Sequence, residues 1–359
     1  MKKIYLLLLY LVFVHSVNAQ LSIMAGTGLF VSGNMPVTLH NTSFINKGNF
    51  IAGNSRVIFS GDASSYISGT RPVQFYELEL QKSAGQSLLL TRNIEVQQRI
   101  WFGSGLLELN GFDIALTYAA RLENEHNNSR ITGNNGGQVL FSALLNAPVA
   151  VNAGNLGISI TAAQNLGNVL IKRGHQSQAL GNGAGNSILR YYDIVATNNS
   201  NLNASIKFTY TDAELNGVNE NKLQLYKSDD ATNWQALEST TANVAGNSIE
   251  KTGIQSFSRF TVSGRSTFSI PLTTGYFNLS PNPFRDKVVI SLVSDIAAEA
   301  IIKVFDSKGV LVKVLTRAVA QGGNQLKIDC VSLQEGVYSI QVEWNNGKIR
   351  RTVQAIKLH

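Results

Sequence analysis

The chain is poor in cysteine, in soft metal ligands and in charge. Its 359 residues include a single cysteine, Cys330, which excludes a disulfide framework. Beyond the first twenty residues four histidines remain, and they are scattered, so we expect no structural zinc site. Charged residues make up 15% of the sequence, whereas a globular chain has about 25%. Asn, Ser, Thr and Gly fill the shortfall and favour short strands and turns over long helices.

Residues 1–19 have the three regions of a secretory signal peptide. Two lysines precede an apolar run over residues 4–14, and Ala19 closes a cleavage site before Gln20. The run is about 11 residues long, whereas a membrane-spanning helix needs about 20. We therefore expect a mature protein that begins at Gln20 and leaves the cytoplasm. A retained N-terminal anchor is the alternative.

The net charge of +7 does not indicate nucleic-acid binding. Lys2 and Lys3 of the leader supply two of the seven charges. The other cations are spread thinly, and the longest run is Arg350-Arg351. A nucleic-acid face needs clustered cations, so we expect no nucleic-acid partner.

Residues 20–145 contain many short apolar runs separated by glycine and asparagine turns. The runs return every 6 to 12 residues or so, which leaves no room for helices between them. Turns such as Asn110-Gly111 suit the corners of stacked coils. The pattern predicts an irregular β-helix or β-solenoid, although no strict period is visible.

Residues 146–268 show a different pattern. Ile206, Phe208 and Tyr210 alternate with polar residues, and polar turns such as Asp229-Asp230 separate the runs. A period of two between turns is typical of an antiparallel β-sandwich. A short polar linker over 269–275 follows.

Residues 276–359 form a compact unit with six expected strands. Two loops with glycine at the demanding position, 306–309 and 345–348, join hairpins. We therefore expect a small Ig-like β-sandwich and an all-β chain. The expected strands cover residues 288–292, 300–305, 310–315, 325–328, 337–343 and 348–356.

Four sequence blocks stand in order in this last unit, at 276–284, 302–309, 333–340 and 355–359. Together they resemble the type A C-terminal sorting domain of the type IX secretion system of Bacteroidetes. The end of the chain departs slightly, because Leu358-His359 stands where a further lysine is usual. The residues that carry the resemblance are Pro281, Asn282, Pro283, Phe284, Asp306, Gly309, Gly336, Tyr338 and Lys357.

The resemblance implies export through the periplasm to the extracellular space or the outer-membrane surface. Its implied partners are the type IX secretion machinery and a sorting peptidase that removes the domain. The cargo of such proteins is often attached to surface lipopolysaccharide. An ordinary adhesive β-sandwich at the C-terminus is the alternative.

The middle unit also resembles a known module. Residues 172–175, 190–194, 210–217 and 225–228 are similar to a β-sandwich that recurs beside such sorting domains in surface proteins. That resemblance implies cell-surface architecture and no particular activity.

Asp212, Glu214 and Asn216 imitate the first half of a calcium loop. Oxygen ligands at alternate positions before a glycine suit a hard cation. However, Leu223 stands where a bidentate acid is required, and a strand precedes the segment. A polar turn is the preferred interpretation, and we assign no metal site.

The sequence supplies no catalytic motif, so we assign neither catalytic residues nor a cofactor. His175 follows two cations and shows no acid partner nearby in the sequence. The first functional hypothesis is a non-enzymatic cargo that binds a glycan or a surface protein. The alternative is a polysaccharide-acting enzyme on a β-helix, and the placement of Glu95, Glu108 and Asp113 bears on that choice.

Overall fold

The computed structural model describes residues 19–180, 185–265 and 276–358. The predicted signal peptide, apart from Ala19, and the predicted linker 269–275 lie outside these residues. The chain divides into an N-terminal unit and a C-terminal unit near residue 266. The described elements are strands and single turns of 3-10 helix, so the predicted all-β class is confirmed. Within the described residues no helix is long and apolar enough to cross a membrane.

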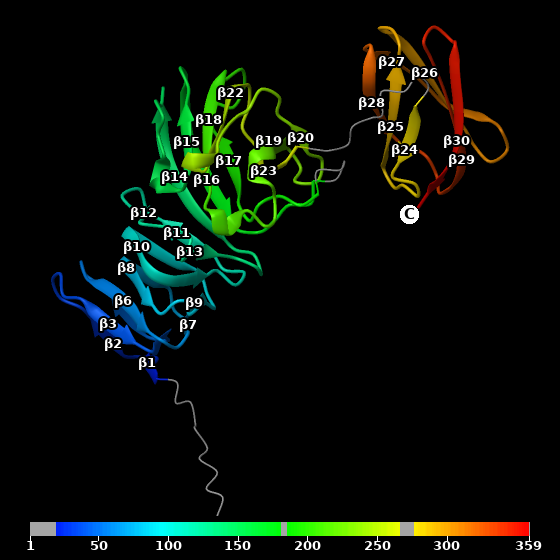
Figure 1. Cartoon of the computed structure of the whole chain (residues 1–359). Helices are drawn as coiled ribbons and strands as arrows, with labels where there is room; N and C mark the ends of the chain where they lie inside the picture. The colour runs from blue at the N-terminus through cyan, green and yellow to red at the C-terminus, as the bar shows by residue number, and fades with distance from the viewer. Residues whose placement is uncertain (1–18, 181–184, 266–275, 359) are drawn as a thin grey trace, which may run out of the picture. The chain divides into compact units, whose positions relative to one another are not determined.

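The N-terminal unit begins with stacked coils of parallel strands (Figure 1). One sheet contains β1 (Ala19–Ile23), β4 (Thr42–Asn46), β7 (Ser65–Gly69), β9 (Ser87–Leu90), the end of β10 (Ile94–Glu108) and β13 (Ser129–Thr132). A second sheet contains β3 (Val37–His40), β6 (Arg56–Gly61), β8 (Val73–Lys82), the start of β10, β11 (Ile114–Leu116), β12 (Arg121–Glu123) and β14 (Gln138–Asn146). The short β2 (Gly28–Phe30) and β5 (Asn49–Ile51) pair in the first coils. The predicted solenoid is therefore present.

The coils vary in length, which explains why the sequence shows no strict period. The register stacks Val37, Val57, Leu78, Ile100 and Leu122 in one ladder, with neighbours 20 to 22 residues apart. In the other sheet the paired residues Phe44 and Ile67, and then Ile67 and Leu90, stand 23 apart. Stacked positions are apolar and almost all buried, because they fill the interior of the coils.

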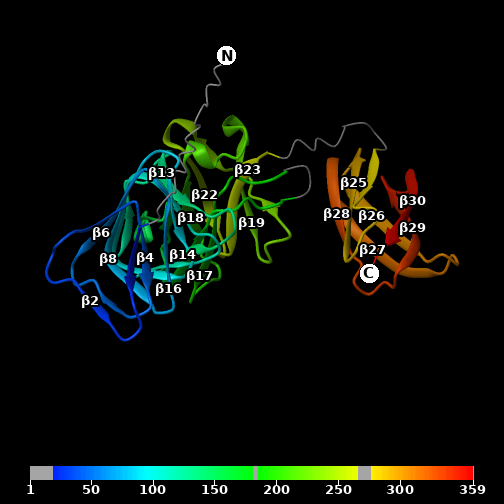
Figure 2. The same cartoon turned by 90° about the horizontal axis from the view of Figure 1, so that it is seen from below.

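The middle region is an antiparallel sandwich that continues the solenoid. Strand β14 pairs parallel with β11 on one edge and antiparallel with β16 (Asn165–Gly174) on the other. The sheet then continues through β17 (Tyr191–Ala196), β23 (Arg259–Gly264), β19 (Leu223–Ser228) and β20 (Gln235–Ala236). A second sheet has the order β15 (Ile158–Thr161), β18 (Ala204–Thr209), β22 (Ser248–Ile254), β21 (Thr241–Asn243). One hydrophobic core runs through solenoid and sandwich. Figure 2 shows the strands of both parts from below.

The C-terminal unit is a separate sandwich with its own core. One sheet has the order β24 (Phe277–Ser280), β25 (Lys287–Ser294), β28 (Gly322–Asp329). The other has the order β27 (Leu311–Val319), β26 (Ala298–Phe305), β29 (Gly336–Trp344), β30 (Ile349–Lys357). Trp344 joins the sheets, since it stacks on Phe277 and its Nε1 donates to the Val293 carbonyl at 2.8 Å. Cys330 is buried in this core.

Candidate functional sites

The opening block of the C-terminal unit, residues 276–284, hydrogen-bonds to the end of β30. The amide of Phe284 donates to the Ile356 carbonyl at 2.8 Å, and the Phe284 carbonyl accepts from the Leu358 amide at 2.8 Å. These bonds make a parallel bridge between Phe284 and Lys357. The Phe284 side chain is buried. Two segments from opposite ends of the unit therefore form one local structure.

The side chains of Asn282 and Lys357 add further hydrogen bonds between the opening block and β30. The Asn282 side chain donates to the Gln354 carbonyl and accepts from the Ile356 amide, both at 2.9 Å. Lys357 is buried, and its Nζ donates to the Arg285 carbonyl at 2.8 Å. The bonds to Pro281 and Pro283 are both cis, and neither proline has an amide hydrogen to satisfy. The side chains of Asn282 and Lys357 therefore hold the segment around residues 282–285 against the end of β30.

Asp306 and Gly309 shape the β26–β27 hairpin. One Asp306 oxygen accepts from the amides of Lys308 and Val310, each at 2.9 Å. Gly309 has a φ of +80°, a backbone conformation that side chains with a Cβ rarely adopt. The turn therefore favours an acceptor side chain at Asp306 and glycine at position 309.

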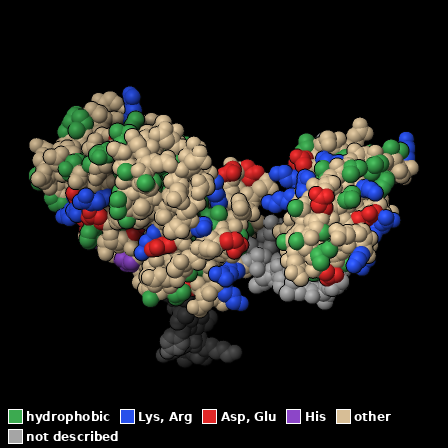
Figure 3. Space-filling model, turned by 90° about the horizontal axis from the view of Figure 1, so that it is seen from above, with side chains coloured by type: hydrophobic (Ala, Val, Ile, Leu, Met, Phe, Trp, Pro, Cys, Tyr) green, Lys and Arg blue, Asp and Glu red, His purple; other side chains and the backbone are tan. Residues whose placement is uncertain are grey.

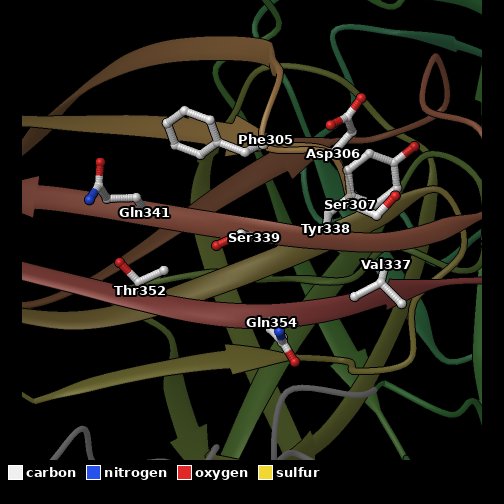
Figure 4. Close-up of a pocket in the computed structure, with 10 residues that line it drawn as sticks. Phe305, Asp306, Ser307, Val337, Tyr338, Ser339, Gln341, Thr352 and Gln354 are labelled. Carbon is white, nitrogen blue, oxygen red and sulfur yellow. The ribbon is translucent and has the colours of Figure 1, made fainter.

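Tyr338 sits at the start of β29. Its hydroxyl donates to the Gln334 carbonyl at 2.7 Å and closes the turn that contains Gly336. Gly336 lies opposite Lys357 in the register of β29 and β30. A cavity of about 380 Å³ is lined by Asp306, Gly309, Tyr338 and the outer-face side chains of β29 and β30 (Figure 4).

All nine predicted sorting residues gather at one end of this sandwich. That end holds the finish of β24, β26 and β30 and the start of β25 and β29. It also presents the last described residue of the chain, Leu358. The geometry therefore defines an all-β domain in which residues of the opening block brace the end of β30.

Residues 278–356 match a family model described as the secretion system C-terminal sorting domain. The chain therefore carries a type IX secretion sorting domain, which directs export to the cell surface or the extracellular space and engages the secretion machinery. The match does not reach the middle unit, so its resemblance to a recurrent module stays a prediction. A search of curated proteins found no match to this chain, and a search of solved structures found none.

The N-terminal unit holds a buried cluster of charges where the coils meet the sandwich. Arg173 on β16 bonds to Glu125 of the turn between β12 and β13, and its Nη1 donates to the Leu156 carbonyl at 3.0 Å. Arg190 pairs with Glu214, with 2.9 Å between Nε and Oε1 and between Nη2 and Oε2. Through the Arg173–Glu125 pair the cluster links the sandwich to the coils of the solenoid.

His175 belongs to this cluster. Its Nε2 accepts from the Nε of Arg173 at 3.2 Å, and its Nδ1 lies 3.6 Å from Oε1 of Glu214. Burial and the charge of Arg173 lower the pKa of His175 to about 4, so the imidazole is neutral at pH 7. Burial alone would raise the pKa of Glu214, but the charge of Arg190 holds it well below its usual range. Sequence reasoning missed the acid partner of His175, because the two stand far apart in the chain.

The weak calcium candidate separates into three different sets of contacts. Asp212 accepts from the amides of Asn127 and Asn247 at 2.9 and 2.6 Å. Glu214 faces Arg190, and Asn216 donates to the Ser187 carbonyl at 2.9 Å. Asp212–Glu214 form a single turn of 3-10 helix, and Asn216 lies just beyond it. In the described part of the chain no three acidic, histidine or cysteine side chains group to hold a metal.

The three acids that bear on the enzyme hypothesis bond to neighbouring coils. Glu95 accepts from the Gln74 side chain, Glu108 from the Thr132 hydroxyl at 2.5 Å, and Asp113 from the Gln138 amide at 2.8 Å. Glu95 and Glu108 lie in different sheets. Glu108 lines a cavity of about 380 Å³ together with His175 and Glu214. The low pKa of Glu214 makes it unsuited to donate a proton as a general acid.

A larger groove of about 590 Å³ lies beside the junction of solenoid and sandwich. Tyr118 and Leu144 stand on it with 79% and 77% of their surface exposed. Polar side chains also line it, from Gln98, Arg121 and Asn146. The groove thus combines an exposed aromatic ring with amide and guanidinium donors.

Proposed function

We propose that the N-terminal unit is a non-enzymatic cargo that binds an uncharged glycan after export. The groove around Tyr118 carries this proposal. An exposed aromatic face stacks on the apolar face of a sugar, and Gln98, Arg121 and Asn146 offer donors for its hydroxyl groups. A groove of this volume accommodates a small number of sugar units.

The chemistry of the surface supports a neutral ligand. On the face of the N-terminal unit visible in Figure 3, uncharged polar side chains and backbone cover most of the area. The carboxylates of the coils are engaged by their neighbours. Arg56 pairs with Glu79 at 3.1 Å, and Arg99 bridges Glu77 and Glu123 at 3.1 and 3.3 Å. Acids bonded in this way favour a binding role over an acid–base role.

The route of export is part of the same proposal. The leader takes the chain into the periplasm, where the machinery recognises the braced end of the C-terminal unit. A sorting peptidase then removes that unit, and the cargo is released or attached to surface lipopolysaccharide. We expect cleavage within residues 266–275, between the two units.

The test is a glycan array probed with residues 20–359. We expect binding to neutral glycans that falls at least tenfold in Tyr118→Ala, because the stacking surface is lost. Tyr118→Phe is the matched control and keeps the binding, since the ring remains. Equal binding by all three proteins would place the ligand elsewhere, and release of shortened glycan would support the enzyme instead.

A further inference from the structure

The two ends of the solenoid differ in how they are covered. At the far end, β14 carries the sheet into the sandwich. At the near end, the first coil contains β1, β2 and β3, which hydrogen-bond to β4, β5 and β6 respectively. Within the described residues each of these three strands is paired residue by residue with that one strand and with no other. The first coil therefore presents open strand edges.

This edge lacks the devices that keep strand edges apart. Proteins usually protect an edge with charged residues, lysine above all. Residues 19–46 contain no Asp, Glu, Lys or Arg. Pro36 interrupts the edge just before β3 and leaves β1 and β2 unprotected. An uncharged edge of this length is a template for pairing with another strand.

Large apolar side chains are exposed on the same coil. Met24, Phe30 and Met35 expose 57%, 65% and 67% of their surface, and Ile51 on the next coil exposes 47%. A solenoid normally ends in a capping repeat with a polar outer face. Here the end coil is apolar and uncharged, which is the character of a surface that is covered in use.

We infer that the first coil pairs with the first coil of a second copy, with β1 antiparallel to its own counterpart across a two-fold axis. A two-fold contact sets every residue against the same surface of the partner. Charged side chains on the edge would meet their own charges there, whereas β1, β2 and β3 carry no Asp, Glu, Lys or Arg. The contact closes after two copies, so it yields a dimer whose two grooves bind a multivalent glycan together.

The proposed dimer depends on the first coil alone. The groove around Tyr118, on which the proposed glycan binding rests, matters only for binding a multivalent glycan. Ser22 is exposed, and as the neighbour of the buried Ile23 it points to the opposite face of β1. In an antiparallel pair centred on Ser22, a charge at position 22 would face the same charge in the partner. Loss of glycan binding in Tyr118→Ala and loss of the dimer in a Ser22 variant are therefore separate results.

The test is the molar mass of residues 20–359 by light scattering after size exclusion. We expect a dimer for the natural sequence. Ser22→Lys and Ser22→Glu each weaken association at least tenfold, or about 1.4 kcal/mol, because like charges oppose each other. An equimolar mixture of the two variants restores the dimer, which shows that both remain folded.

Thr70→Lys, on an exposed turn of an inner coil, is the matched control and leaves the mass unchanged. A monomer for the natural sequence at all concentrations would overturn the inference. So would a dimer that survives both Ser22 variants, because its interface would then lie elsewhere. A mixture that stays monomeric would equally exclude pairing of β1 with β1.

Discussion

The buried charges of the N-terminal unit make its stability depend on pH. The pKa of His175 is about 4 in the folded chain, against 6.5 for an unperturbed histidine. Between these values the unfolded chain binds more protons, so acidification favours unfolding. We expect the free energy of unfolding of this unit to fall by about 3 kcal/mol from pH 7 to pH 4 through His175. Urea unfolding followed across this range measures it.

His175→Gln flattens this dependence between pH 6.5 and 4, because the titrating group is gone. His126→Gln removes an exposed histidine and serves as the control. The lowered pKa values of Glu125 and Glu214 add a second loss below about pH 4.3, where unfolded carboxylates take up protons. A natural protein with equal stability at pH 7 and 4 would contradict the burial argument.

The charged cluster also marks the limit of residue-level sequence reasoning. Arg173 and His175 stand out in the sequence, but their partners Glu125 and Glu214 lie 48 and 39 residues away. Pairing over such separations follows from where the coils end and the sandwich begins. By contrast, Asp306 and Gly309 bond within one turn, so their roles can be predicted from local sequence.

At the scale of elements, β30 depends on a side chain from the opening block. Asn282 makes two hydrogen bonds to the backbone of β30, at Gln354 and Ile356. Asn282→Ala leaves both backbone groups without this partner, so we expect the end of β30 to lose about 1 to 3 kcal/mol of local stability. Hydrogen exchange at residues 354–358 measures the loss.

Asn278→Ala in β24 is the matched control for that change. It truncates the same residue type four positions earlier, and we expect exchange in β30 to stay as in the natural protein. If export follows the braced end, the Asn282 variant also reaches the surface in smaller amount. Unchanged exchange in both variants would show that the backbone bridge at Phe284 alone holds the strand.

Strands could be predicted where apolar and polar residues alternate regularly. They could not be predicted where a strand forms only by pairing with a distant segment of the chain. The six strands expected in the C-terminal unit are present. The clearest is β29, in which the buried Tyr338, Ile340 and Val342 alternate with less buried residues. Strand β24 was not expected, since Phe277–Ser280 reads as part of the proline block and becomes a strand by pairing with β25. Likewise the double role of β14 depends on neighbours on both edges.

At the scale of the whole molecule, the low charge has a structural reason. Coils and sandwich share one apolar core. Their many short strands are joined by turns, and turns favour Gly, Asn and Ser over charged residues. The N-terminal unit keeps an uncharged first coil and a groove with an aromatic ring. The C-terminal unit is braced around the end of the chain. These features suit the proposed division of labour, in which one part binds a ligand and the other part carries the sorting domain.

The last prediction separates these two parts. A chain that ends before residue 276 keeps the whole core of the N-terminal unit, so it should fold but lack the sorting domain. We expect it to accumulate in the periplasm, with surface display reduced to background in protease-accessibility assays on intact cells. The reciprocal control fuses residues 276–359 to an unrelated periplasmic protein, which should then reach the surface. Normal display of the truncated chain would mean that the export signal lies within the coils or the middle sandwich.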